Sequence, residues 1–459
     1  MKRNKNFFQC EDCGYESLQW LGRCPSCGSW NTFIKKEVST GIRKESKCRP
    51  DSKAKTIGTF QYDKKWKRYL SGMNEFDRVL GGGIVPGSLV LIGGEPGVGK
   101  STLLLQVSNK LSINNGKTLY ITAEESMNQV YLRAKRLEVH SQDLYIYSEA
   151  DLDRIDEQIQ TLKPKIAVID SIQIIYDRSV NSMPGSVNQV KNCTGRLMDI
   201  AKKNNIAIII IGHVTKGGAI AGPKLLEHMV DSVLYLEGEK FQAFKLLRGI
   251  KNRFGATHEL GIFQMKSDGL QEVLNPSEMM LSTRKKAIAG TATTVTFEGS
   301  RPLVVEIEAL VSTSFLTNPR RMTSGVDYNR VLLIIAVLEN RLGMKFQYKD
   351  IYVNVAGGIR ISEPAIDLGI ALAIVSSFKR IALELNLVAF GEIGLTGELR
   401  SVNVTERRLK EAQKIGFTQG IIPLSDAKKM AVRFNNMKLY GISIIYDIVQ
   451  FFKKKKKKE

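Results

Sequence analysis

The strongest constraint on the fold is a glycine-rich loop, Gly94-Glu95-Pro96-Gly97-Val98-Gly99-Lys100-Ser101. The loop matches the P-loop pattern and lies between an apolar run at 89–93 and a helical pattern at 102–111, which is the strand, loop and helix context that this motif requires. Glycines let backbone N–H groups surround phosphates, and the N-terminus of the helix favours their negative charge. The sequence therefore predicts a nucleoside triphosphate site, although the loop alone does not identify adenine.

The loop also predicts which residues hold the nucleotide. We expect ATP to be bound by Gly94 through Thr102, with Lys100 on the β- and γ-phosphates and Ser101 on Mg²⁺. The apolar run at 166–169 ends in Asp170, and a carboxylate after a strand beside the P-loop is a candidate for the Mg²⁺ shell. The alternative for Asp170 is an ordinary turn residue.

Hydrolysis also needs a group that positions the attacking water. Glu124 and Glu125 follow the β-rich run at 118–122, which we expect to lie near the first strand of the sheet. Either carboxylate could reach the γ-phosphate from that position. Spacing alone does not decide between them.

The P-loop belongs to a longer α/β pattern from about residue 62 to residue 275. Short β-rich runs alternate there with helical patterns, at 89–93, 118–122, 166–170, 206–211 and 232–236. Strands separated by helices predict a central parallel sheet with crossover connections. A second α/β unit is expected at 286–452, with apolar helices near 331–338 and 365–376. The predicted fold class is α/β multidomain.

Residues 1–34 contain two Cys-x-x-Cys-Gly knuckles, built on Cys10, Cys13, Cys24 and Cys27. Four thiolates at this spacing can surround one tetrahedral Zn²⁺. A thioredoxin-like redox role would need a βαβ context that so short a segment cannot supply. We therefore predict a four-cysteine zinc ribbon, followed at 35–61 by a polar linker.

The chain carries 67 Lys and Arg against 46 Asp and Glu, a formal charge of +21. Such an excess favours polyanionic partners, although a general bias toward lysine is an alternative explanation. Residues 453–459, which begin with six lysines at 453–458, are interpreted as a solvated basic tail. Because the sequence has neither a signal peptide nor an apolar run long enough to span a bilayer, we expect a cytoplasmic protein without a membrane partner.

These features together resemble the bacterial recombination and repair ATPase family RadA, also called Sms. The resemblance rests on the four-cysteine start, on the P-loop with its Ser101 and Thr102, and on Lys251-Asn252-Arg253-Phe254-Gly255. It implies a RecA-like ATPase core and a homo-hexameric ring that hydrolyses ATP in a DNA-dependent way. It further implies helicase or translocase activity on single-stranded and branched DNA, and branch migration with the recombinase RecA.

The resemblance also assigns residues. By similarity to RecA-type ATPases, Glu124 is the catalytic glutamate and His213 senses the γ-phosphate, with a structural histidine as the alternative. Lys251 and Arg253 would reach the nucleotide of a neighbouring subunit as finger residues, or else contact DNA or solvent. The loops at 176–188 and 215–224 would face the pore and bind DNA, and they contain Arg178, Lys216 and Lys224. Ordinary surface loops are the alternative.

The unit at 286–452 resembles the proteolytic domain of Lon, on the motifs at 354–358, 363–365 and 391–398. Active Lon enzymes use a Ser-Lys dyad. The matching positions here hold Ala365 and Glu406, so the resemblance implies an inactive domain that serves as a scaffold for ring assembly. Ser362 is interpreted as a helix cap. Arg320, Arg321 and Arg330 are candidates for a DNA-facing surface.

Overall fold

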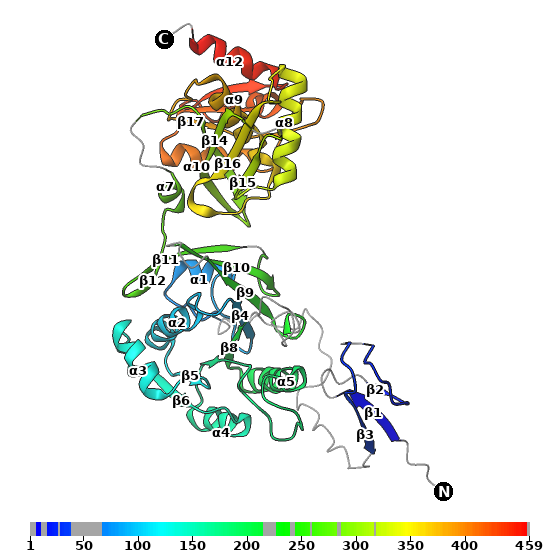
Figure 1. Ribbon diagram of the computed structural model, residues 1–459. Coiled ribbons are helices and arrows are strands. Elements are labelled where there is room, and N and C mark those ends of the chain that lie inside the picture. The colour runs from blue at the N-terminus through cyan, green and yellow to red at the C-terminus, as the bar shows by residue number, and fades with distance from the viewer. Residues whose placement is uncertain are drawn as a thin grey trace, which may run out of the picture. The chain divides into compact units, whose positions relative to one another are not determined.

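The computed structural model describes residues 6–10, 16–25, 28–37, 67–213, 226–238, 244–257, 259–281, 286–315 and 318–456. The chain divides into two compact units, Met1–Glu272 and Val273–Glu459. Figure 1 shows the elements of each unit along the chain. Each unit has its own sheets and its own buried side chains.

The N-terminal segment forms a small antiparallel sheet. Its strands are β1 (Asn6–Cys10), β2 (Glu16–Ser17) and β3 (Phe33–Glu37), in the order β2-β1-β3. Among residues 6–10, 16–25 and 28–37, the buried side chains are Cys10, Cys24 and Phe33, and Phe8 and Leu21 pack against them. So few apolar residues cannot supply much stability on their own.

The first unit is built on a nine-stranded sheet with the order β12-β11-β10-β9-β4-β8-β7-β5-β6. The parallel strands are β4 (Leu89–Gly94), β5 (Thr118–Thr122), β6 (Leu144–Ser148), β7 (Ile166–Asp170), β8 (Ala207–His213) and β9 (Ser232–Glu237). Three antiparallel strands extend it: β10 (Phe244–Asn252), β11 (Leu260–Lys266) and β12 (Gly269–Glu272).

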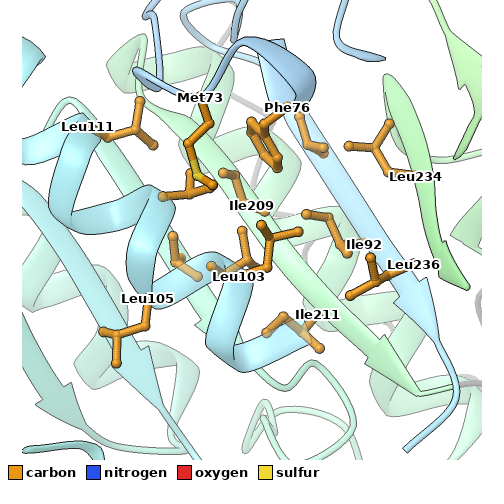
Figure 2. Packing of buried hydrophobic residues seen from close by; sticks show 14 of the residues in the cluster. Met73, Phe76, Ile92, Leu103, Leu105, Leu111, Ile209, Ile211, Leu234 and Leu236 are labelled. Carbon is orange, nitrogen blue, oxygen red and sulfur yellow. The ribbon is translucent and has the colours of Figure 1, made fainter. Parts of the chain in front are cut away.

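Helices cover both faces of this sheet. One layer contains α1 (Asn74–Val79), α2 (Lys100–Asn115) and α3 (Met127–Arg136), and the other contains α4 (Leu152–Leu162) and α5 (Val187–Asn204). Along β4, Val90 and Ile92 point to the first layer, and Leu89 and Leu91 to the second. Figure 2 shows the first layer, where side chains of α1 and α2 pack on Ile92, Ile209 and Leu234.

The predicted central parallel sheet is confirmed, and the five predicted strands correspond to β4, β5, β7, β8 and β9. The structure adds β6 at one edge and an antiparallel extension at the other, neither of which the alternation of strands and helices had indicated. Strands β9 to β12 pair consecutively and antiparallel. Antiparallel neighbours can be joined by hairpins, so no helix separates them in the sequence.

The second unit contains a seven-stranded mixed sheet, β15-β16-β14-β13-β17-β20-β21. Its strands are β13 (Thr291–Glu298), β14 (Arg301–Thr313), β15 (Arg321–Ser324), β16 (Lys349–Val355), β17 (Leu387–Ala389), β20 (Gln419–Pro423) and β21 (Lys438–Ile442), and β18 (Glu392–Ile393) pairs with β19 (Leu399–Arg400).

The helices of this unit are α7 (Pro276–Met280), α8 (Tyr328–Leu342), α9 (Asp367–Lys379), α10 (Thr405–Ile415), α11 (Leu424–Met430) and α12 (Tyr446–Lys456), with short turns η2 (Ala356–Gly358) and η3 (Pro364–Ile366). The two predicted apolar helices are α8 and α9. Residues 367–376 of α9 are all buried, which explains its continuous apolar sequence.

Candidate active site

The carboxyl ends of β4, β5, β7 and β8 meet at one edge of the first sheet, and the polar residues predicted for the nucleotide follow those strands. The P-loop leaves β4 and enters α2 at Lys100. A Cβ atom on Gly94 would lie 2.5 Å from the carbonyl oxygen of Leu236, so only glycine fits there. Gly99, which precedes the helix, has φ of 115°, also a glycine conformation.

Lys100 is almost fully buried at the base of this loop. Its Nζ donates to the carbonyl oxygens of Gly94, at 2.9 Å, and Glu95, at 3.0 Å. Burial lowers the pKa of the ammonium, and the nearby carboxylates of Asp170 and Glu124 act in the opposite direction. The Lys100 ammonium group therefore lies inside the loop that would bind the phosphates.

Asp170 ends β7 and is 7% exposed. Its carboxylate accepts a hydrogen bond from the hydroxyl of Tyr120 at 2.7 Å, and the Ser101 side chain lies close enough to affect its pKa. Burial raises the pKa of Asp170, while the Ser101 and Tyr120 hydroxyls act in the opposite direction. A hydroxyl and a carboxylate side by side at the start of α2 are oxygen ligands of the kind that Mg²⁺ prefers, so the residues fit that ion.

The two candidate glutamates have different partners. Glu124 Oε1 accepts from the Ser171 hydroxyl and lies 3.2 Å from His213 Nε2, at the end of β8. Glu125 instead forms an ion pair with Arg133 of α3. The structure thus brings Glu124 and His213 together beside Asp170 and Lys100, and it turns Glu125 toward a partner in the following helix.

Lys251 and Arg253 lie elsewhere. Residues 251 and 252 pair with Val233 and Ser232 at the start of β9, whereas the P-loop side of β4 pairs with Leu236 at the end of that strand. Val233 and Ser232 precede Leu236 by three and four residues, which is about 10–13 Å along the strand at roughly 3.3 Å per residue. The two finger candidates therefore cannot reach the nucleotide edge of their own sheet.

Both of these cations have partners within the chain. Lys251 Nζ donates to the carbonyl oxygens of Glu227, at 2.6 Å, and Val230, at 2.9 Å. Arg253 Nη1 lies 3.1 Å from Asp231 Oδ1, and the arginine side chain remains 50% exposed. Burial and the neighbouring guanidinium lower the pKa of Lys251. Half of the Arg253 side chain is thus available to another molecule.

Of the three DNA-binding candidates, only Arg178 falls within the described residues; Lys216 and Lys224 lie outside them. Arg178 Nη2 lies 2.6 Å from the buried carboxylate of Asp151, and its side chain is 60% exposed. The segment around it is held by Gln189, whose Nε2 donates to the carbonyls of Asp177, Val180 and Ser182. These bonds tie the loop to the start of α5.

The predicted zinc ligands are only partly described, because Cys13 and Cys27 lie outside the described residues. Cys10 and Cys24 are both buried beside Phe33. The amide of Gly28 donates to the carbonyl of Cys24 at 2.9 Å, and Gly28 has φ of 77°, as a tight knuckle requires. Two buried cysteines in so small a core fit a structural Zn²⁺.

In the second unit, the positions that match the Lon dyad carry no nucleophile and no lysine. Ala365 is buried in η3, and its carbonyl accepts from the Gly391 amide at 2.8 Å. Glu406 lies on α10 with Lys410 Nζ at 2.8 Å. The expectation that Ser362 caps a helix is wrong: the N-cap residues of η3 and α9 are Glu363 and Ile366.

The three arginines proposed for a DNA-facing surface differ in their contacts. Arg330 Nε donates to the buried carboxylate of Asp367 at 2.8 Å, and Arg321 donates to backbone carbonyls that include that of Phe346, at 3.0 Å. Arg320 donates through its backbone amide to Asp350 Oδ1. The guanidinium groups of Arg330 and Arg321 therefore serve the fold of their own unit.

Sequence reasoning did not find Tyr120, Ser171 or Arg133, which contact Asp170, Glu124 and Glu125. Ser171 directly follows Asp170, and that adjacency was a usable signal. Tyr120 and Arg133 could not be found in this way, because their partners lie on other elements. Tyr120 meets Asp170 only because β5 and β7 are neighbours in the sheet.

Models of known families match three segments of the chain. An AAA domain matches residues 61–219, a rubredoxin metal binding domain matches residues 8–35, and subunit ChlI of Mg-chelatase matches residues 328–426. Three proteins, each named DNA repair protein RadA, are similar over most of their length. The identities are 48% in Halalkalibacterium halodurans (98% of this chain and 99% of the relative), 49% in Bacillus subtilis (93% and 94%) and 50% in Listeria monocytogenes (91% of each). The chain belongs to the RadA family of DNA repair proteins.

Membership of the RadA family confirms the resemblance seen in the sequence. The predicted fold class is confirmed as well: a zinc ribbon, a P-loop ATPase domain with a central parallel sheet, and a Lon-like α/β domain, of which the last falls in the segment matched by the ChlI model. None of the described helices is long and apolar enough to cross a membrane.

Proposed function

We propose that this chain is a DNA-dependent ATPase of homologous recombination and DNA repair, which binds single-stranded DNA and drives branch migration with RecA. The observation that carries the proposal is the group of Lys100, Asp170, Glu124 and His213 at one sheet edge. The names of the RadA relatives supply the connection to DNA repair. The formal charge of +21 suits a nucleic acid partner.

In the proposed reaction, Lys100 exchanges its two carbonyl partners for phosphate oxygens of ATP, and the P-loop amides bind the remaining oxygens. Ser101 and Asp170 hold Mg²⁺, which supplies charge neutralisation at the phosphates when bound. Glu124 orients the attacking water and accepts its proton. The contacts of its carboxylate with Ser171 and His213 support this role, because they hold it at the same sheet edge as the P-loop. His213 responds to loss of the γ-phosphate through the same carboxylate.

We further propose that Lys251 and Arg253 act on the nucleotide of a neighbouring copy in a homo-hexameric ring. This assignment is supported by their place at the end of the sheet opposite the P-loop, where they cannot reach a nucleotide bound to their own subunit. In a ring they would face the nucleotide of an adjacent subunit. Arg178, Lys216 and Lys224 would contact the DNA backbone, and the C-terminal unit would hold the ring together. The four cysteines of the ribbon would bind Zn²⁺.

Replacing Arg253 with alanine is expected to lower DNA-stimulated ATP turnover by about 10³-fold or more, because the neighbour's guanidinium stabilises charge on the transferring phosphoryl group. ATP binding, measured with a fluorescent nucleotide, should persist. Arg248→Ala on the same strand provides the matched control, since Arg248 lies near Glu237 and not at this edge. Full DNA-stimulated turnover in Arg253→Ala would refute the finger assignment.

The proposed function is tested by ATP turnover with and without single-stranded DNA, together with unwinding of a forked duplex. We expect stimulation by DNA in the wild type and no turnover in Lys100→Ala. A properly metallated protein that hydrolyses ATP at one constant rate, whatever DNA is added, would contradict the proposal. A protein that binds ATP yet moves no strand would be an assembly regulator and not a motor.

A further inference from the structure

A buried tyrosine lies behind the candidate Mg²⁺ ligands. Tyr120 is in the middle of β5 and is 1% exposed. Its hydroxyl donates to Asp170 Oδ2 at 2.7 Å, a bond between adjacent parallel strands. The rest of the ring packs within the apolar cluster beneath α2.

Packing alone does not explain why this position has a hydroxyl group. Phenylalanine would fill the same space in an apolar cluster, and burying a hydroxyl costs free energy unless it is hydrogen-bonded. The bond that offsets this cost is made to the one carboxylate that ends β7. A donor held in the core and aimed at an anion fixes that anion's rotamer more firmly than a surface donor would.

We propose that Tyr120 is a positioning residue for the Mg²⁺ of the nucleotide site. It anchors Oδ2 of Asp170 and thereby leaves the other carboxylate oxygen free to turn toward Ser101, at the start of α2. Ser101 and the free oxygen of Asp170 would hold the ion, and the bond from Tyr120 would keep the carboxylate in place. Outer-shell partners of this kind orient metal ligands in other proteins.

The inference rests on the proposed nucleotide site and predicts a specific defect in Tyr120→Phe. The half-saturating Mg²⁺ concentration for tight binding of a fluorescent ATP analogue should rise about tenfold or more, the usual effect of losing an outer-shell partner. Binding of the same analogue in excess EDTA should match the wild type, because the P-loop and Lys100 are unchanged. ATP turnover at saturating Mg²⁺ should largely recover.

A second measurement follows the metal itself. Mn²⁺ binding to the protein with a non-hydrolysable ATP analogue, followed by electron paramagnetic resonance, should weaken by a similar factor. Tyr145→Phe is the matched control, since it removes a phenol from the neighbouring strand β6, where the side chain is 37% exposed. Its Mg²⁺ and Mn²⁺ dependence should equal that of the wild type.

Three results would overturn the inference. The first is an unchanged Mg²⁺ and Mn²⁺ dependence in Tyr120→Phe. The second is a loss of nucleotide binding in Tyr120→Phe that is equally large in excess EDTA and in Mg²⁺. The third is a wild-type protein whose nucleotide affinity does not respond to Mg²⁺. None of these readouts involves DNA. Failure of the proposed DNA-dependent motor would therefore leave them intact, and the two proposals can fail separately.

Discussion

Glu124→Gln is expected to lower the rate of ATP hydrolysis by about 10²–10⁴-fold while leaving ATP binding close to that of the wild type. The amide keeps the shape of the side chain and can still bond to Ser171, but it cannot accept a proton from the attacking water. Glu124 is the carboxylate that lies 3.2 Å from His213 Nε2 at the nucleotide edge. Turnover and fluorescent nucleotide binding should be measured on the same preparation.

Glu125→Gln is the matched control for this experiment. Its carboxylate pairs with Arg133 on α3, so the change removes a partly exposed ion pair and not the proposed base. We expect a turnover within a few-fold of the wild type, because such pairs contribute about 0–1 kcal/mol. An inactive Glu125→Gln beside an active Glu124→Gln would reverse the assignment.

The second large effect is expected in the C-terminal unit. Arg408 is fully buried, and its guanidinium contacts the Glu363 carboxylate, with Nη1 to Oε2 at 3.1 Å, and the Val295 carbonyl at 2.7 Å. The ring of Phe297 lies under the same group, 4.7 Å from centroid to Cζ. Glu363 belongs to the Lon-like motif, where an active enzyme would carry its nucleophile two residues later.

Arg408→Met should destabilise this unit by about 3 kcal/mol, because it removes a fully buried cation and leaves the partly buried Glu363 carboxylate, 25% exposed, without its partner. Hydrogen–deuterium exchange should rise in α10 and β13, the elements that the pair joins. The control is Arg433→Met, which removes an exposed ion pair to Glu406 from the same region. Equal protection in both variants would show that the pair of Arg408 and Glu363 does not stabilise the unit.

Several parts of the site were predictable because they are local in sequence. A P-loop is read from residues that follow one another, and the strand before it and the helix after it were visible as patterns. Asp170 and the pair Glu124 and Glu125 were found because each follows an apolar run, and the carboxyl ends of parallel strands share an edge. The positions that match the Lon dyad, Ala365 and Glu406, could also be located from flanking motifs alone.

Other parts depended on contacts between distant elements. Glu124 and Glu125 are neighbours in the chain, so spacing could not separate them, and only Ser171, His213 and Arg133 do so. No helices separate the antiparallel strands β10 to β12, so the alternation of strands and helices did not predict them. Because β10 runs antiparallel to β9, Lys251 and Arg253 lie at the end of the sheet away from the P-loop.

The sequence by itself thus determined that this chain has a zinc ribbon, a P-loop ATPase domain and a Lon-like domain, because local motifs and the periods of helices and strands encode these features. Only the tertiary structure decided which carboxylate lies beside His213, that the Tyr120 hydroxyl donates to Asp170, and that Arg408 is buried. The physical reason is that hydrogen bonds and burial depend on strand order and layer packing, which join residues far apart in the chain.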